Sequence, residues 1–256
     1  MKKPIISLQV YSVRDVFMND AQMAIKEIAK LGYEGIEFFN YPDIPKAEDL
    51  KKWNDEAGLK CVAHNVNWND ILPENISATL EYCKKLGTNR VIIGSAPPAD
   101  LDKRTKVPAF IDAINKAYET AKNEGFEIGY HTHYSDFAKV DGISFWDRVL
   151  SNTPEDFQMI LDTGNCEAGG GNSVHYLNKY PNRSMIVHLK PYHEKLAAAT
   201  MMGEDSYDWD ELVKLAVEKG NADTLTLEYS YDNGKPSMEN AKTCYDYIKA
   251  IVDKTF

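Results

Sequence analysis

The sequence predicts one α/β domain, spanning residues 1–256, that folds as a closed (β/α)8 TIM barrel. Eight short apolar runs alternate with amphipathic stretches along the chain, and about 250 residues is the usual size of an eight-unit barrel. A glycine follows five of the amphipathic stretches, and glycine commonly supplies the left-handed residue that closes a helix. Since parallel strands need a crossover helix between them, eight such units indicate a parallel sheet.

The strands and helices are assigned from these runs in chain order. The eight strands are expected at Pro4–Gln9, Tyr33–Phe38, Lys60–His64, Arg90–Gly94, Phe126–His131, Phe157–Asp162, Ser184–His188 and Thr224–Glu228. The eight helices are expected at about Ala21–Leu31, Ala47–Ala57, Glu74–Leu86, Val107–Glu124, Ser144–Leu150, Val174–Lys179, Trp209–Lys219 and Met238–Asp253. A doubly wound open sheet is the alternative, but it usually has a glycine-rich turn after its first strand. The residues at that place, Gln9 to Ser12, include no glycine.

Composition and charge exclude several classes of protein. The net charge of −10 disfavours nucleic acid and anionic membrane as partners. The chain has no apolar run of about 18 residues, so we expect no transmembrane helix. Its first residues turn polar too early for a signal peptide. The four cysteines are scattered without CxxC spacing, which indicates reduced thiols, no thiolate metal site and a cytoplasmic location.

Polar residues stand where the apolar strands end. Residues two apart on a strand point to the same side, so in Thr224–Glu228 the leucines share one face and Thr226 and Glu228 share the other. If the apolar faces meet the helices, the polar ends point into the mouth of the barrel, where such folds place their chemistry. The residues expected there are Gln9, Glu37, His64, His131, Asp162, His188 and Glu228.

Four consecutive strands, the fifth to the eighth, end in groups that can bind a metal ion. His131, Asp162, His188 and Glu228 offer mixed oxygen and nitrogen ligands without thiolate, a set that suits Mn²⁺, Co²⁺, Zn²⁺ or Mg²⁺. Each residue alone has a common structural explanation, as a turn cap, a solvated side chain or a hydrogen-bonded histidine. Together they indicate a Lewis acid that acidifies a C–H bond beside a sugar carbonyl. Isomerisation, epimerisation and β-elimination share this first step.

The chain resembles, over nearly its whole length, the xylose-isomerase-like sugar phosphate isomerase/epimerase superfamily. The resemblance rests on YEGIEF (33–38), YHTH (130–133), LDTGN (161–165), VHLK (187–190), LEY (227–229) and the closing helix around 239–249. It implies a divalent-metal site, most often Mn²⁺, with His131, Asp162, His188 and Glu228 as ligands. It also implies an isomerase or epimerase of a small sugar. A glycine-rich segment at 168–173 lacks a basic partner, which favours an unphosphorylated substrate.

One residue departs from the pattern of that superfamily. Many relatives have glutamate where this chain has His131, and that glutamate exchanges protons together with the strand-eight glutamate, here Glu228. Either His131 still ligates and another group carries protons, or the metal affinity is reduced. The candidates for proton transfer are His133, which lies two residues beyond His131, and also His64 and Lys190. The expected substrate contacts are Gln9, Glu37, Asn165 and Trp68.

Three other functions compete with an isomerase or epimerase of a carbohydrate. A lyase or dehydratase would act by β-elimination on an oxidised sugar, a glycoside or an inosose, and one base with a metal serves that reaction equally well. A DNA-repair endonuclease would have a histidine where Asn165 stands and an Asp-x-His near 201–205, which is absent. A non-enzymatic sugar-binding barrel would bind no metal. The expected partner is a small carbohydrate, and a homo-oligomer is possible.

Overall fold

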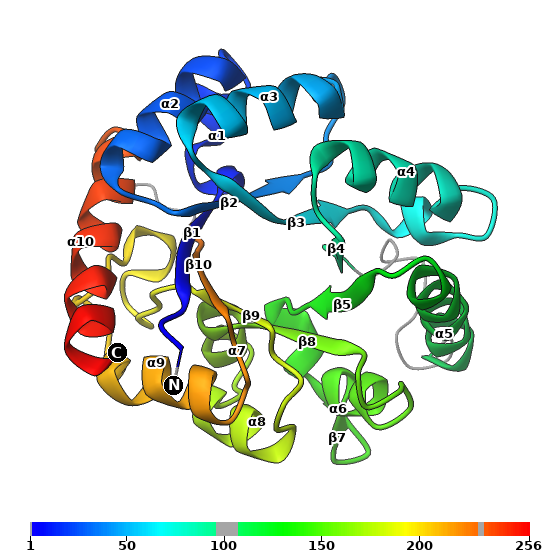
Figure 1. Cartoon of the computed structure of the whole chain (residues 1–256). Coiled ribbons are helices and arrows are strands. Elements are labelled where there is room, and N and C mark those ends of the chain that lie inside the picture. The colour runs from blue at the N-terminus through cyan, green and yellow to red at the C-terminus, as the bar shows by residue number, and fades with distance from the viewer. Residues whose placement is uncertain (1, 96–106, 230–232) are drawn as a thin grey trace.

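The computed structural model describes residues 2–95, 107–229 and 233–256, and its eight parallel strands close into a barrel, as predicted. Neighbouring strands follow the order β1-β10-β9-β8-β5-β4-β3-β2 and then return to β1. Figure 1 looks along the barrel, with the helices placed around the strands. The barrel strands are β1 (Ile5–Gln9), β2 (Gly35–Phe39), β3 (Lys60–Val66), β4 (Arg90–Ile93), β5 (Glu127–His131), β8 (Gln158–Asp162), β9 (Ile186–Leu189) and β10 (Thr224–Leu227).

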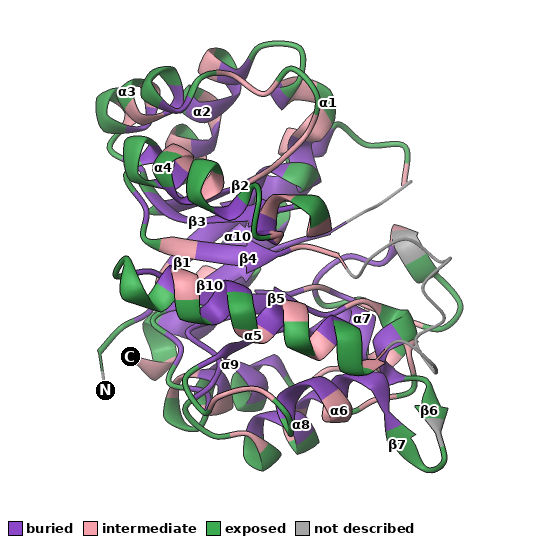
Figure 2. Ribbon diagram, turned by 90° about the vertical axis from the view of Figure 1, so that its right-hand side faces the viewer, coloured by how far each residue is buried: buried purple, intermediate pink, exposed green. Residues whose placement is uncertain are grey.

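The helices form the outer layer, and their exposed residues face away from the buried strands (Figure 2). They are α1 (Arg14–Phe17), α2 (Ala21–Leu31), α3 (Ala47–Ala57), α4 (Ile76–Leu86), α5 (Val107–Asn123), α6 (Phe145–Leu150), α7 (Thr163–Ala168), α8 (Ser173–Lys179), α9 (Trp209–Glu218) and α10 (Ser237–Thr255). Short α1 and α7, and the hairpin of β6 (Lys139–Val140) and β7 (Ile143–Ser144), were not predicted. No helix among the described residues is both long enough and apolar enough to cross a membrane.

The alternation within each strand divides the core into two parts. The outward side chains, such as Leu225 and Leu227, join the large cluster packed under the helices. The inward side chains form a small separate cluster at the middle of the barrel, made of Ala63, Ile92, Ile160, Met185 and Ile186. Above this apolar layer the inward positions become polar. The sequence of a strand therefore sets both its packing against the helices and the chemistry of the barrel mouth.

A β-bulge in β3 reverses which residues of that strand face inward. Ile36 of β2 pairs with Cys61, but the next residue, Glu37, pairs with Ala63, so Val62 is an extra residue on β3. The sequence prediction placed His64 inside the barrel because it assumed regular alternation from Val62. The bulge shifts the alternation by one residue and turns His64 outward. Asn65 takes the inward position instead.

At the amino end of the barrel, one guanidinium group joins residues at the starts of three strands. Arg90, at the start of β4, donates from Nε to Glu127 Oε2 at 2.8 Å. Its two terminal nitrogens bind the two oxygens of Asp223 at 2.8 and 2.7 Å. Asp223 directly precedes β10, so Arg90 links strands from distant parts of the chain. A bidentate pair of this kind fixes geometry as well as charge.

Candidate metal centre

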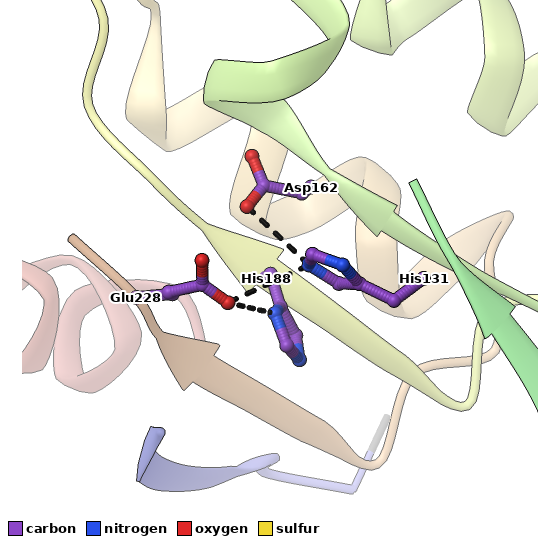
Figure 3. A group of neighbouring side chains, drawn as sticks. All are labelled: His131, Asp162, His188 and Glu228. Atoms are coloured by element: carbon purple, nitrogen blue, oxygen red, sulfur yellow. Dashed lines mark hydrogen bonds and ion pairs between the residues drawn. The ribbon is translucent and has the colours of Figure 1, made fainter. Parts of the chain in front are cut away.

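The four predicted ligands lie together at the carboxyl end of the barrel (Figure 3). His131 ends β5, Asp162 ends β8, His188 lies in β9, and Glu228 directly follows β10. All four side chains are buried, and one ligand atom from each lies within 4.8 Å of the other three. They come from four adjacent strands of the barrel. This cluster, the metal-ligand cluster, can hold a divalent metal ion.

Two of the ligand atoms have no hydrogen-bond partner although they are fully buried. His131 Nε2 lies 3.5 Å from both Asp162 Oδ2 and Glu228 Oε2. Among the described residues, neither His131 Nε2 nor Asp162 Oδ2 accepts or donates a hydrogen bond. Buried polar atoms are rarely left unpaired. Metal–ligand bonds of about 2.0–2.3 Å place neighbouring ligand atoms roughly 3–4 Å apart, so the spacing of these atoms fits a shared cation.

Asp162 combines the two functions that the sequence left open, a helix cap and a ligand. Its Oδ1 accepts a hydrogen bond from the backbone N–H of Asn165 at 2.6 Å and so caps α7. Its backbone N–H donates to Thr132 Oγ1 at 3.0 Å, which fixes the end of β8 against β5. These contacts leave Oδ2 aimed at His131 and free to ligate.

Glu37 holds His188 in place from beneath the mouth. Its carboxylate is completely buried and accepts a hydrogen bond from Gln9 Nε2 at 2.7 Å, and another from Asn65 Nδ2 at 2.5 Å. His188 Nε2 lies 3.1 Å from Glu37 Oε2, while His188 Nδ1 faces Glu228 at 2.9 Å. A carboxylate behind a ligating histidine fixes its tautomer and orientation. Glu37 was expected to contact substrate, but the structure places it beneath the mouth, fully buried and bonded to Gln9, Asn65 and His188.

Lys190 places a positive charge beside the metal-ligand cluster. Its Nζ lies 3.0 Å from Glu228 Oε1 and 3.6 Å from Asp162 Oδ2. Thr163 Oγ1 exchanges hydrogen bonds at 2.9 Å with the backbone N–H and C=O of Lys190, which holds this residue at the end of β9. Burial alone would lower the pKa of Lys190, but the charges of Asp162 and Glu228 raise it. The side chain is therefore an ammonium at neutral pH.

The cluster as a whole attracts positive charge. Burial would lower the pKa of His188, but the charge of Glu37 and the hydrogen bonds with Glu228 and Glu37 raise it to about 10. The pKa of His131 is also raised, by Asp162 and Glu228, against the effect of burial. Although burial opposes it, the charges of Lys190 and His131 and the hydrogen bond with His188 hold the pKa of Glu228 well below its ordinary value. Protons and a metal ion therefore compete for the same nitrogen atoms.

A cavity of about 400 Å³ opens above the metal-ligand cluster and forms the mouth of the barrel. It is lined by Gln9, Tyr11, Phe39, Asn40, Asn65, Val66, Asn67, Gly94, Ser95, His131, His133, Tyr134, Asn165, Lys190 and Glu228. The predicted contacts Gln9 and Asn165 are among these residues. Sequence reasoning missed Asn65 and the aromatic residues. Two features of the sequence could have indicated these residues. Asn65 is two residues from Ala63 and so shares its inward face, and Tyr11 and Tyr134 each lie just beyond the end of a strand.

His133 lies in the mouth, as predicted, beside the metal-ligand cluster. Its ring centroid is 5.0 Å from that of His131, with the rings nearly perpendicular. No ion pair joins His133 to another described residue, in contrast to His131 and His188. Burial, followed by the charge of His131, lowers the pKa of His133 to about 4. The imidazole is therefore neutral at pH 7 and can accept a proton.

Two predicted site residues lie outside the mouth. His64 points towards α4, where its ring packs on Tyr82 at 5.2 Å between centroids and lines a separate cavity of about 160 Å³. The bulge in β3 accounts for this direction. Trp68 stacks on Phe110 of α5, with 4.6 Å between centroids and 11° between planes. Phe110 therefore covers one face of Trp68, and Trp68 is not among the described residues that line the mouth.

Comparisons with known proteins agree with this fold. The sequence profile of the family described as xylose isomerase-like TIM barrel matches residues 25–251. An inosose dehydratase from Clostridium beijerinckii is 23% identical over 268 residues, which cover 90% of this chain and 89% of that protein. A solved structure of a sugar phosphate isomerase/epimerase from Parabacteroides distasonis is 23% identical, with a TM-score of 0.81, and the match covers 98% of this chain and 96% of that one.

A more distant likeness extends to a third protein. The solved structure of an L-ribulose 3-epimerase has a TM-score of 0.70 and 15% identity, and the match covers 98% of this chain and 95% of that one. At these identities the solved structures show the fold alone. The family profile, in contrast, spans most of the chain. The protein therefore belongs to the xylose isomerase-like TIM-barrel family.

Proposed function

We propose that the protein is a divalent-metal-dependent lyase that acts by β-elimination on an unphosphorylated, oxidised carbohydrate. The observation that carries this proposal is the composition of the mouth, which joins a four-ligand cluster to one neutral imidazole and one ammonium group. A divalent ion held by His131, Asp162, His188 and Glu228 would polarise a carbonyl group and so acidify the neighbouring C–H bond. Mn²⁺ is the first candidate, and Co²⁺, Zn²⁺ and Mg²⁺ suit the same ligands.

The residues around the cluster divide the work of proton transfer. His133 lines the cavity beside the metal-ligand cluster, so we assign it to accept the proton from the carbon beside the carbonyl group. The Lys190 ammonium, fixed by Glu228 at 3.0 Å, stabilises the negative charge that develops on a substrate oxygen. Gln9 and Asn165 lie at the cavity wall, where their amide groups can meet sugar hydroxyls. His64 and Glu37 take no direct part.

The presence of one uncommitted base favours elimination over epimerisation. To invert a carbon centre, one group must remove a proton from one face and a second must return it to the other. His131 and Glu228 belong to the ligand set of the cluster, so His133 is the cavity-lining base outside that set. A single base can return its proton to the departing oxygen on the same face. Isomerisation also needs only one base.

The proposed reaction balances without an oxidant or a reductant. The C–H bond next to the carbonyl breaks, and its electron pair forms a C=C bond to the next carbon. The C–O bond on that carbon then breaks, and the oxygen leaves with the bonding electrons. The proton taken by His133 neutralises this oxygen, so the products are an unsaturated ketone and water or an alcohol. The similarity to the inosose dehydratase supports our preference for elimination over isomerisation or epimerisation.

Aldose–ketose isomerisation is the second candidate, favoured by the same single base and by the likeness to a sugar phosphate isomerase/epimerase. The two reactions differ in where the proton goes. We would incubate the metal-loaded protein in D₂O with free ketoses, inosose and 3-oxo-glycosides, and follow each by NMR. Loss of water or of an alcohol supports the lyase. Deuterium in a recovered sugar of unchanged composition supports the isomerase and contradicts the lyase.

The metal requirement has a separate test. We expect about one Mn²⁺, Co²⁺ or Zn²⁺ ion per chain after dialysis and elemental analysis, and loss of this ion in His188→Ala or Glu228→Ala. Glu239→Ala, an exposed residue on α10, is the control and should keep the ion. A wild-type protein that takes up no divalent ion at neutral pH would contradict the proposal.

A further inference from the structure

We propose that the rim of the mouth is a subsite for a second ring, so that the substrate is a glycoside rather than a free monosaccharide. The subsite is formed by Tyr11, Phe39 and Tyr134, which we call the aromatic rim. This inference rests on the proposed function, because it places the reacting ring at the metal-ligand cluster. It adds the class of substrate, which no comparison assigns to this chain.

The aromatic rim and the metal-ligand cluster share one cavity. The same space of about 400 Å³ is lined at its floor by His131, Lys190 and Glu228 and at its edge by the three aromatic residues. Cavities of roughly 300–1,000 Å³ are the size that holds a drug-sized ligand, which has more atoms than a single sugar ring. A ring bound at the floor would therefore leave room beside the rim.

The topology places the aromatic residues on opposite sides of this cavity. Tyr11 lies two residues beyond the end of β1, and Tyr134 lies three residues beyond the end of β5. In the closed strand order, three strands separate β1 from β5 in each direction, so the two tyrosines face each other across the mouth. Tyr11 is 39% exposed and Tyr134 is 63% exposed. Ligand pockets are lined predominantly by hydrophobic and aromatic side chains, and both tyrosines line this cavity.

One side of the rim is held rigid by its neighbours. The Tyr11 ring meets Phe39 edge-on with 5.5 Å between centroids. The Arg14 guanidinium stacks on Tyr11 at 4.3 Å and donates to its backbone carbonyl at 2.9 Å. Phe39 in turn packs on Tyr41 at 5.2 Å. A ligand ring would therefore meet an ordered surface, which lowers the entropy cost of binding.

The chemistry of the lining selects a neutral ring with hydroxyl groups. Aromatic faces pack against the apolar C–H face of a sugar or against an aryl ring. Amides of Asn40, Asn65 and Asn67 line the same wall and suit hydroxyl groups. Within the described part of this lining, Lys190 at the floor is the only lysine or arginine, while the Arg14 guanidinium packs on the Tyr11 ring without lining the cavity. A neutral glycoside fits this distribution.

A glycoside also completes the elimination. When the carbonyl lies two carbons from the anomeric carbon, the proton leaves the carbon between them and the anomeric C–O bond breaks. The departing oxygen keeps the bonding electrons, takes the proton that His133 removed and becomes the hydroxyl of the released alcohol. The second ring leaves with that alcohol, and no electrons are gained or lost overall.

The test compares ligands that share one sugar and differ only in the second ring. We would measure, by NMR titration of the metal-loaded full-length protein, the binding of methyl β-glucoside, phenyl β-glucoside and cellobiose. These glycosides lack the oxidised carbon, so the measurement reports binding and not turnover. We expect phenyl β-glucoside or cellobiose to bind about tenfold more tightly than methyl β-glucoside. Tighter binding of only one of them identifies the second ring as aryl or sugar.

Variants locate the effect on the rim. Tyr134→Ala should bring the three dissociation constants to within about threefold of one another, while its metal affinity stays that of the wild type. Tyr134→Phe should keep the preference, because it keeps the ring. Tyr247→Ala removes a tyrosine of α10 that is as exposed as Tyr11 but does not line the cavity, and this change should leave the three dissociation constants unchanged. Tyr11→Ala is the second rim variant if Tyr134→Ala does not fold.

Two outcomes would overturn the subsite. Equal affinity of the wild type for all three glycosides, or no binding of any of them, contradicts a second-ring site. In either case the metal analysis and the deuterium experiment with free ketoses and inosose still decide the proposed function independently. A preference that survives in both Tyr134→Ala and Tyr11→Ala would also contradict the assignment, because the second ring would then lie elsewhere.

Discussion

The two ends of the barrel hold their charged groups in different ways. At the amino end, Arg90 meets the carboxylates of Glu127 and Asp223 with three hydrogen bonds of 2.7–2.8 Å. At the carboxyl end, the carboxylates of Glu37, Asp162 and Glu228 gather around two imidazoles and Lys190. The first group satisfies its donors with protein atoms. The second leaves two buried ligand atoms unpaired.

This difference separates a structural charge group from a functional one. The donors of Arg90 in the amino-end group are paired with protein carboxylates, so we interpret this group as one that stabilises the fold. When both imidazoles are neutral, as metal ligation requires, three carboxylates and one ammonium group leave a net charge of −2, which a divalent ion would balance. A protein that only needed to close the barrel would not keep such a cluster, because buried uncompensated charge destabilises the folded state. The same type of substitution should therefore have opposite consequences at the two ends.

The largest expected effect is the loss of metal binding in Asp162→Asn. Asparagine still caps α7 through its carbonyl oxygen, but its amide group then replaces the free Oδ2 and cannot ligate. If four ligands share a binding free energy of about 10–16 kcal/mol, losing one weakens binding roughly 100–1,000-fold. Calorimetric titration with Mn²⁺ or Zn²⁺ measures this change. The melting temperature in EDTA should stay the same or rise.

The matched control makes the same change at the other end of the barrel. Asp223→Asn should bind the metal with the affinity of the wild type. Equal loss of metal affinity in both variants would show that the effect comes from a general disturbance of the barrel, and the contrast between the ends would fail.

The second prediction compares two buried histidines with opposite pKa shifts. His188 lies between carboxylates, whereas burial lowers the pKa of His64 to about 4. The unfolded chain protonates this histidine below about pH 6.5, while the folded protein resists protonation until about pH 4. The contribution to stability is therefore complete above pH 6.5 and falls as the pH drops towards 4. A shift of this size corresponds to about 3 kcal/mol.

Urea unfolding in EDTA at pH 7 and pH 4.5 measures this loss. His64→Phe keeps a ring against Tyr82 and should lose about 2–3 kcal/mol less between the two pH values than the wild type does. His175→Phe, at an exposed position of α8, is the control and should behave as the wild type. The same pH dependence in His64→Phe as in the wild type would refute this origin of the effect.

The bulge beside His64 shows where sequence reasoning reaches its limit. Helix-closing glycines and regular alternation predicted the barrel because both are local features of the chain. Gly32, for example, has φ of 106°, and a Cβ there would lie 2.8 Å from the ring of Tyr245. The extra residue in β3 depends on its pairing with β2, which no local pattern records. A single inserted position was enough to exchange His64 for Asn65 at the mouth.

The site was predictable to the extent that it depends on strand ends. His131, Asp162, His188 and Glu228 come together because four adjacent parallel strands end at the same edge of the barrel. The position of Glu37 beneath His188 was not predictable in this way, since it depends on the tilt and closure of the barrel. The same is true of the contact between Trp68 and Phe110, which joins two segments on the outer face.

The third prediction tests Glu37 as a positioning residue for His188. In Glu37→Gln one carbonyl oxygen must serve Gln9, Asn65 and His188, and the new amide group lies against His188 Nε2. The substitution then stabilises less well the His188 tautomer in which Nε2 carries the proton and Nδ1 is free to ligate. Metal affinity should fall about 10–100-fold, and ¹⁵N NMR of the imidazole should show a mixture of tautomers. Glu127→Gln is the control and should keep the metal affinity of the wild type. An equally large fall in metal affinity in Glu127→Gln would refute the positioning role of Glu37.

The smallest expected effect is on stability at the amino end. Burial would raise the pKa of Asp223, but hydrogen bonds from Arg90 and Thr224 lower it. Its side chain is 48% exposed, so solvent screening limits the loss in Asp223→Asn to about 1 kcal/mol at pH 7. Because the folded pKa is depressed, the contribution is complete above the unfolded value of about 3.9 and disappears as the pH falls through the folded value. Urea unfolding should therefore show a difference from the wild type at pH 7 that shrinks below pH of about 4; a difference independent of pH would mean that Asp223 acts through packing and not through its charge.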